Sequence, residues 1–257
     1  MNIKSDIFKQ LIVQNLKERY LNAVLGPVWA LLQPGLLLAT YAFVFTYIFS
    51  SRLPEAYEVS FVAYMAIAFW PWNAFAESLQ AGTTAIVENK ALLEKVAISP
   101  VVIVVSKVTA TFIFNMIGYA LILVVLAIAG VKLHWIMLPV IIIPLLALFI
   151  LSNILAIILS SMQVFIRDIT HLLQFIITSL FFLSPILYPP EMIPEEYRSY
   201  LELNPLIYYF TTIRDILING EWMLGWLDLK QIIITLVALI VSYVVYKRCR
   251  PSFEDYL

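Results

Sequence analysis

Charge is scarce in this sequence. Asp, Glu, Lys and Arg make up 13% of its 257 residues, whereas hydrophobic residues make up 62%. Soluble domains are about a quarter charged and about half apolar, so the composition excludes an ordinary soluble domain and indicates an integral membrane protein. The formal net charge is −1, and no long run of Lys and Arg is present. The sequence therefore offers no electrostatic footprint for nucleic acid.

Cysteine, histidine and glycine are informative because they are few. The single Cys249 excludes an internal disulfide, and two histidines expected on opposite membrane faces give no metal site. None of the seven glycines is followed directly by a Lys, so the glycine-rich loop with which many ATPases bind phosphate is missing. We expect no catalytic residue, no cofactor and no metal ion on this chain. An embedded enzyme would need clustered polar groups at one interface, and no such cluster is evident.

Long apolar segments dominate what is present. A transmembrane helix needs about 20 mostly apolar residues, and six segments qualify, one of which contains the carboxylate of Glu77. We predict an all-α integral membrane protein with a single transmembrane domain over residues 1–257. The predicted spans are 28–50, 61–87, 102–130, 137–163, 169–188 and 229–247.

The flanks of these spans predict the orientation. Eleven Lys and Arg residues lie on one set of flanks and five on the other. Because Lys and Arg accumulate on the cytoplasmic side, we predict a multi-pass protein with both termini in the cytoplasm. The loop 88–100 would then be cytoplasmic, and the segment 189–228 would face outward.

Residues 1–25 are predicted to form an amphipathic interface helix. Ile3, Ile7 and Leu11 recur on one helical stripe, while most of the charged residues fall elsewhere, a pattern that suits the headgroup layer of a membrane. The pair Gly26-Pro27 would end this helix and turn the chain into the bilayer. The alternative is a polar leader without a fixed structure.

The two longest connections each predict short helices. The cytoplasmic loop 88–100 places Leu92 and Leu93 among residues of both charge signs, which is typical of a docking surface, although a solvated connector has the same pattern. In the outward segment, Asn204 suits a helix N-cap, Pro205 the first helical position and Gly220 the end. We predict an outward hairpin of two short helices, with a soluble cap as the alternative.

Aromatic residues are abundant in the outer halves of the first two predicted spans. Because rings stack on the apolar faces of sugars without fixing their position, we propose them as a lining along which a carbohydrate slides. An interfacial aromatic belt is the other interpretation. The candidate conduit residues are Tyr41, Phe45, Phe49, Phe69, Trp70 and Trp72.

These features together resemble a known family, the membrane subunits of ABC transporters that export lipid-linked polysaccharides such as O-antigen, teichoic acid and capsule. The similarity runs through nearly the whole chain. It rests on "LKERYLNAVLGPVWALLQP" at 16–34, "FWPWNAFAESL" at 69–79, "ENKALLEKVAISP" at 88–100, "VFIRDI" at 164–169, "SPILY" at 184–188 and "LNPLIYYFTTIRDILING" at 203–220.

The resemblance implies a division of labour with a second protein. Two copies of this permease would form a homodimer with the conduit between them, in a bacterial inner membrane. Two separate P-loop ATPase subunits would bind ATP and Mg²⁺. The segment 88–100 would contain the coupling helix that enters a groove on the ATPase, and 189–228 would hold two gate helices. The coupling residues implied are Glu88, Asn89, Lys90, Leu92, Leu93 and Lys95.

The resemblance also draws attention to two other places. Arg167 and Asp168 match the family's cytoplasmic corner, where a structural salt bridge with helix capping is at least as good an explanation as substrate contact. Arg214, with Tyr209 nearby, is a gate candidate that would meet a substrate phosphate or reach the lipid headgroups. The function implied is export of a lipid-linked polysaccharide, foremost O-antigen for lipopolysaccharide biosynthesis. A permease for teichoic acid, capsule, lipids or drugs is the alternative.

Overall fold

The computed structural model describes residues 3–18, 28–49, 59–96, 98–201, 204–221 and 226–256. These residues form helices joined by turns, with no strand among them, as the apolar composition predicts. The α-helices are α1 Ile3–Glu18, α2 Val28–Phe43, α3 Phe61–Glu88, α4 Lys90–Lys95, α5 Pro100–Ile128, α6 Ile142–Gln163, α7 Ile169–Leu183, α8 Glu195–Leu201, α9 Pro205–Arg214, α10 Trp226–Cys249 and α11 Phe253–Tyr256.

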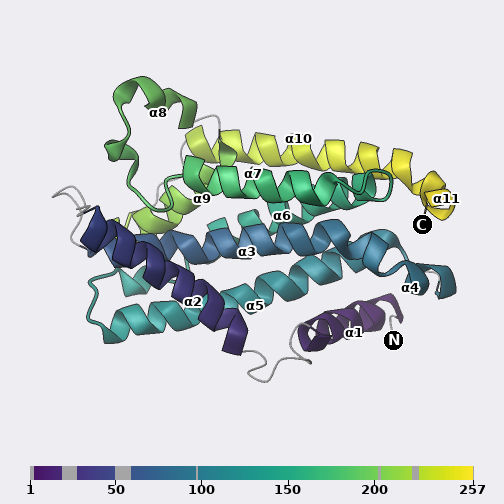
Figure 1. Cartoon of the computed structure of the whole chain (residues 1–257), viewed down its shortest axis with the longest axis horizontal. Helices are drawn as coiled ribbons and strands as arrows, with labels where there is room; N and C mark the ends of the chain where they lie inside the picture. Colours follow the sequence, from purple (N-terminus) through teal and green to yellow (C-terminus); the bar gives the residue numbers. More distant parts are fainter. Residues whose placement is uncertain are drawn as a thin grey trace.

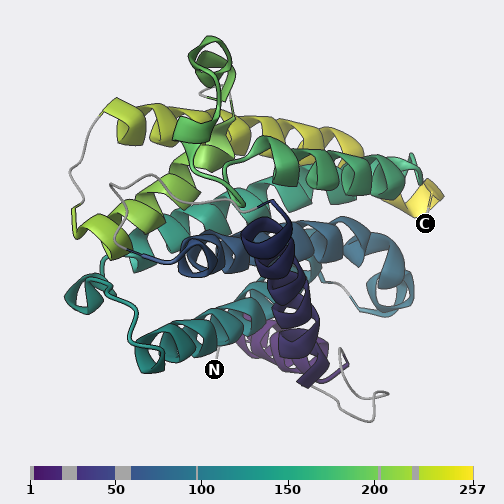
Figure 2. The same cartoon turned by 60° about the vertical axis from the view of Figure 1, so that its left-hand side comes forward.

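The long helices lie side by side in one bundle. Figure 1 shows α4 and α11 at one end of the bundle, near the N-terminus, and α8 at the other end; we call these the α4 end and the α8 end. In both views α2 lies across α3, and α1 packs against α5 (Figures 1 and 2). The predicted break at Gly26-Pro27 lies outside the described residues.

Three helices in the described residues are long and apolar enough to cross a membrane: Pro100–Ile128, Ile142–Gln163 and the stretch Asp228–Ser252 that includes most of α10. Two further apolar stretches, Leu32–Ile48 and Ile169–Leu183, are shorter. The 28 residues of α3 are long enough for a span, but polar side chains make this helix less apolar. The chain is thus a multi-pass membrane protein, and its six-span topology stays a prediction.

Prolines explain why two helices are shorter than the predicted spans. Residues 138–141 form turns after Trp135–Met137, so α6 begins at Ile142 rather than at 137. Pro144 is then the third residue of α6, where its missing N–H costs nothing. At the other boundary, Ser184 precedes Pro185 and is extended, because the proline ring disfavours a helical residue before it. Helix α7 therefore ends at Leu183.

Helix α3 is the centre of the fold, because it packs against α5, α6, α7, α9 and α2. On the side of α3 toward α5 and α6, a Cβ added at Gly82 would lie 2.6 Å from both Ala156 Cβ and Val108 Cγ2. Only a residue without a side chain lets the three helices approach so closely. Ser60 starts α3 by accepting a hydrogen bond from the N–H of Ala63, 3.2 Å away, as an N-cap serine does.

Candidate functional site

The predicted coupling segment is a short hook at the α4 end. Helix α4 follows α3 after a turn at Asn89, whose side-chain amide donates to the carbonyl of Ala85 at 2.9 Å. Leu92 and Leu93 turn toward the body of the protein and pack against its core. The exposed residues of α4 are instead Lys90, Ala91, Glu94 and Lys95.

An ion pair fixes the base of this hook. The ammonium of Lys107 on α5 lies 2.8 Å from a carboxylate oxygen of Glu88, the last residue of α3. Partial burial alone would raise the pKa of Glu88, but hydrogen bonds from Lys107 and Thr84 outweigh it and lower the pKa below its ordinary value. The pair joins the ends of α3 and α5 where α4 leaves them.

Arg214 occupies the centre of the α8 end and is only 3% exposed. Its Nε donates to the carbonyl of Tyr64 at 3.0 Å, and its two terminal nitrogens donate to the carbonyls of Pro185 and Ile186. The guanidinium carbon also lies 3.7 Å from the centre of the Tyr64 ring, in a cation–π arrangement. Arg214 thus holds α3, α9 and the turn after α7 together; its role at a gate stays a prediction.

The start and end predicted for the second short helix of 189–228 are confirmed in the structure. Asn204 accepts a hydrogen bond from the N–H of Leu206 at 3.0 Å, and Pro205 is the first residue of α9. A π-helical turn, Asp215–Asn219, extends this helix to Gly220, whose φ of +71° is left-handed. Helix α8 precedes it, so the segment does contain two short helices.

Helix α9 is tied to α10 by two tyrosines. The hydroxyl of Tyr209 is buried and accepts a hydrogen bond from the Gln231 side chain at 2.7 Å. Tyr208 donates to the carboxylate of Asp228. Burial raises the pKa of Tyr208, and its bond to Asp228 and the charge of that carboxylate raise the pKa further. Tyr209, a predicted gate residue, therefore lies inside the subunit.

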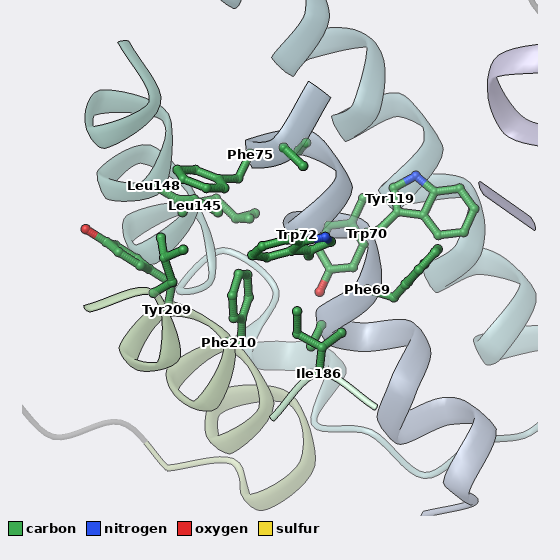
Figure 3. Packing of buried hydrophobic residues seen from close by; sticks show 14 of the residues in the cluster. Phe69, Trp70, Trp72, Phe75, Tyr119, Leu145, Leu148, Ile186, Tyr209 and Phe210 are labelled. Atoms are coloured by element: carbon green, nitrogen blue, oxygen red, sulfur yellow. The ribbon is translucent and has the colours of Figure 1, made fainter. Parts of the chain in front are cut away.

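The candidate conduit rings separate into two groups. Phe69, Trp70 and Trp72 are buried in an aromatic cluster with Phe75 and Phe210 (Figure 3). They would meet a substrate only after the helices around them move. The α2 rings lie nearer the surface: Tyr41 and Phe45 are half-buried, and Phe49, in the segment after α2, is 64% exposed. A role in the conduit stays a prediction for all six.

The corner between α6 and α7 is organised by backbone rather than by the two charges. The carbonyl of Arg167 accepts hydrogen bonds from the side chains of Gln163 and Thr170, both at 3.0 Å. Asp168 occupies the N-cap position of α7, but its carboxylate makes no capping hydrogen bond. Both charged side chains are exposed at the α4 end. Contact with a substrate there stays a prediction.

A line of polar side chains on α3 was not predicted from the sequence. Only Glu77 stood out there, as a carboxylate within a predicted span. These residues are spaced by three or four positions and therefore share one helical face. Each is exposed or half-buried in the structure, although most of α3 is buried. We call this line the polar stripe; it consists of Asn73, Glu77, Gln80, Thr84 and Glu88.

Comparison with known proteins decides the family. A family model described as "ABC-2 type transporter" matches residues 7–218, which is most of the chain. The protein is an ABC-2 transporter membrane subunit. In this family the ATPase is a separate subunit, which agrees with the missing phosphate loop in the sequence of this permease.

Curated relatives match this permease over nearly their full lengths. It is 31% identical over 211 residues to the O-antigen export system permease protein RfbA of Myxococcus xanthus, covering 80% of this chain and 78% of the relative. A Klebsiella pneumoniae protein of the same name is 27% identical over 91% of this chain and 90% of its own. The polysialic acid transport protein KpsM of Escherichia coli is 23% identical over 92% and 91%.

Proposed function

We propose that this permease exports a lipid-linked polysaccharide, foremost an O-antigen, outward across a bacterial cytoplasmic membrane. One observation carries the proposal: three relatives named as O-antigen export permeases match the chain over 78%, 90% and 96% of their lengths. Capsular polysaccharide is the second candidate cargo, because a polysialic acid transport protein also matches over 91% of its length.

We further propose that two copies of the permease assemble with two copies of a P-loop ATPase, which binds ATP and Mg²⁺. The α4 end is then cytoplasmic, and the α8 end faces outward. The hook fits the role of coupling helix because it projects beyond the bundle (Figure 1) and bears Lys90, Ala91, Glu94 and Lys95 on its exposed side. Closure of the ATPase dimer would push on α4 and, through the Glu88–Lys107 pair, on α3 and α5.

The cargo is tested by deleting the gene in its host. We expect the deletion strain to lose the glycan from its surface and to accumulate it inside, bound to lipid, and we expect this chain to restore display. Immunoblots with antibodies against the O-antigen and against the capsule, on whole cells and on extracted lipid, separate the two cargoes. Unchanged display of both glycans would refute polysaccharide export.

The coupling surface is tested by reversing charge on the hook. Lys90→Glu combined with Lys95→Glu changes two exposed side chains without touching the packed Leu92 and Leu93, so the bundle should stay folded. We expect the ATPase subunit to be lost when the permease is purified from membranes. Lys132→Glu, an exposed lysine near the α8 end, is the matched control and should keep it. Equal recovery of the ATPase with the hook variant and with the control variant would show that the hook does not contact the ATPase.

A further inference from the structure

The polar stripe is costly wherever lipid covers it. Asn73, Glu77, Gln80 and Thr84 lie within α3, which packs beside the long apolar helices α5 and α6, and each retains exposure to its surroundings. A polar group without a hydrogen-bonding environment costs several kcal/mol in an apolar medium, so intramembrane polar side chains face protein or water. The stripe extends from Asn73 to Glu88, about 22 Å along the helix axis. Asn73 and Thr84 donate to the carbonyls of Phe69 and Ala81 in α3 itself. The polar surface that stays exposed beyond these bonds, above all at Gln80, is what needs a polar neighbour in a membrane.

The same face of α3 is covered toward the α8 end. One and two turns before the stripe, this face carries Ala66, Phe69 and Trp70, all buried. The ring of Tyr41 on α2 packs edge-on against Phe69, with centroids 6.0 Å apart. Both views show α2 crossing α3 toward the α8 end (Figures 1 and 2). The face therefore changes from apolar and covered to polar and uncovered as α2 diverges.

Helix α5 extends the polar face beside α3. Asn115 donates to the carboxylate of Glu77 at 3.0 Å, and Lys107 donates to that of Glu88 at 2.8 Å. Thr111 lies one turn from each of these two α5 residues, on the same face. Amides, hydroxyls and charged groups therefore follow one another from the middle of the bundle to the hook.

We propose that the polar stripe of α3 lines a water-filled path along which the glycan enters the transporter from the cytoplasmic side. This inference rests on the proposed export of a polysaccharide. Sugar hydroxyls both donate and accept hydrogen bonds, and the stripe offers amide donors, amide and carboxylate acceptors and a hydroxyl. Neighbouring members lie about 4.5–6 Å apart along the axis. A passing chain can thus exchange one partner for the next.

Cysteine labelling tests whether the stripe meets water. Thiols react as thiolates, which form in water and are suppressed in apolar surroundings. In a Cys249→Ser background, single variants Gln80→Cys and Thr84→Cys are compared with Ile113→Cys, whose side chain is 44% exposed on α5. The Glu77–Asn115 and Glu88–Lys107 contacts place Ile113 at the depth of the stripe. The complete transporter, with its ATPase, is labelled in inner-membrane vesicles with a cationic, membrane-impermeant methanethiosulfonate.

We expect both stripe cysteines to react at least about tenfold faster than Ile113→Cys, which corresponds to one unit of thiol pKa. Labelling is then repeated, without ATP, in vesicles from cells that make the polysaccharide and from cells in which its synthesis is blocked. We expect the polysaccharide to slow labelling of Gln80→Cys and Thr84→Cys severalfold and to leave Ile113→Cys unchanged.

Two results would overturn the inference. Stripe cysteines as unreactive as Ile113→Cys would show that lipid or a second copy of the chain covers the stripe. Fast labelling that the polysaccharide does not slow would show a wet surface that the glycan does not use. A deletion strain that still displays its glycan would refute the proposed cargo, and because display is measured separately, the two failures are distinguishable.

Discussion

The two halves of α3 use the same helical face for opposite purposes. Toward the α8 end, which we propose faces outward and call the outer half, this face packs Phe69 and Trp70 into the aromatic cluster beneath α2. Toward the α4 end, which we propose is cytoplasmic and call the cytoplasmic half, it presents the exposed Gln80 and the half-buried Thr84. A buried half is constrained by packing, whereas the polar half, if it lines the proposed path, is constrained by what passes along it. Substitutions in the two halves should therefore separate stability from transport.

The largest effect on stability is expected at the outer anchor. Arg214→Met removes the donor to the carbonyls of Pro185 and Ile186 and a second donor to that of Tyr64, which also belongs to the hydrogen-bond ladder of α3. Each buried carbonyl left unpaired costs about 1–3 kcal/mol. We expect destabilisation of about 3 kcal/mol or more, measured as a lower midpoint of thermal unfolding of the purified transporter. Arg198→Met is the control, because Arg198 is exposed and bonds to the carbonyls of Glu191 and Ile193. Equal shifts of the two midpoints would contradict the anchoring role.

The packing of the outer half is tested at its central ring. Phe69→Ala removes contacts with Tyr41, Trp70 and Phe181. We expect the free energy of unfolding to fall by about 2–3 kcal/mol. This is at the lower end for such cavities, because the hydrophobic effect does not drive helices together in lipid. Gln80→Ala, in the other half, should change stability by less than about 0.5 kcal/mol. Thermal unfolding in the same detergent compares the two variants. A larger drop in midpoint for Gln80→Ala than for Phe69→Ala would contradict the assignment of packing to the outer half.

The cytoplasmic half should respond in transport instead. Gln80→Leu combined with Thr84→Val removes two hydrogen-bonding groups while nearly preserving volume. Since each bond is worth about 0.5–1.5 kcal/mol, we expect the rate at which new glycan appears at the surface to fall about tenfold. Pulse-labelled glycan captured on intact cells gives this rate. Ile113→Val, at the same depth on α5, should leave this rate unchanged. An equal fall in the rate with Ile113→Val would show that the effect is not specific to the stripe.

The smallest effect is expected at the base of the hook. The pKa of Glu88 is lowered in the folded protein, so its ion pair stabilises the fold above the ordinary carboxylate pKa, and this contribution is lost as pH falls through the folded value. Because Glu88 and Lys107 are partly exposed, Glu88→Gln should cost less than about 1 kcal/mol at pH 7. The difference in unfolding midpoint between wild type and variant should shrink toward pH 4. A difference in midpoint that stays the same at every pH would show that the charge of Glu88 does not stabilise the fold.

Local features were predictable from the sequence because they depend on neighbouring residues. Asn204 as N-cap, Pro205 in the first turn and Gly220 at the end all belong to one short segment, and capping uses only nearby backbone groups. The long apolar stretches were predictable for the same reason. Pro144 and Pro185 carried the information for the shortened α6 and α7, but an average over apolar residues conceals their effect.

Contacts between distant segments were not predictable. Arg214 is 150 residues from Tyr64 and 28 from Ile186, and no sequence pattern brings these groups together. A charge near the outer boundary suggested contact with headgroups, whereas the fold surrounds it with carbonyls. Similarly, the spacing of Leu92 and Leu93 indicated a docking patch, but that spacing does not reveal which side of a six-residue helix faces the body.

The polar stripe lay between these cases. Its spacing of three and four residues was readable from the sequence, but a span is recognised by mean hydropathy, which does not distinguish one helical face from another. Only Glu77 stood out, because a carboxylate is conspicuous in an apolar segment. The uncovered state of Gln80 and Thr84 depends on where α2 crosses α3, which the sequence does not specify.

The helix that links the hook to the Arg214 anchor has one weak point. Pro71 lies inside α3, just before the aromatic half gives way to the stripe, and proline removes a rung of the helical ladder and permits a bend there. The part of α3 between Pro71 and the hook can therefore tilt while the part before Pro71 stays held by Arg214, and the proposed contact of the hook with an ATPase would drive that tilt. In the proposed transporter, such a tilt would change the spacing of helices around the stripe and leave the aromatic packing before Pro71 in place.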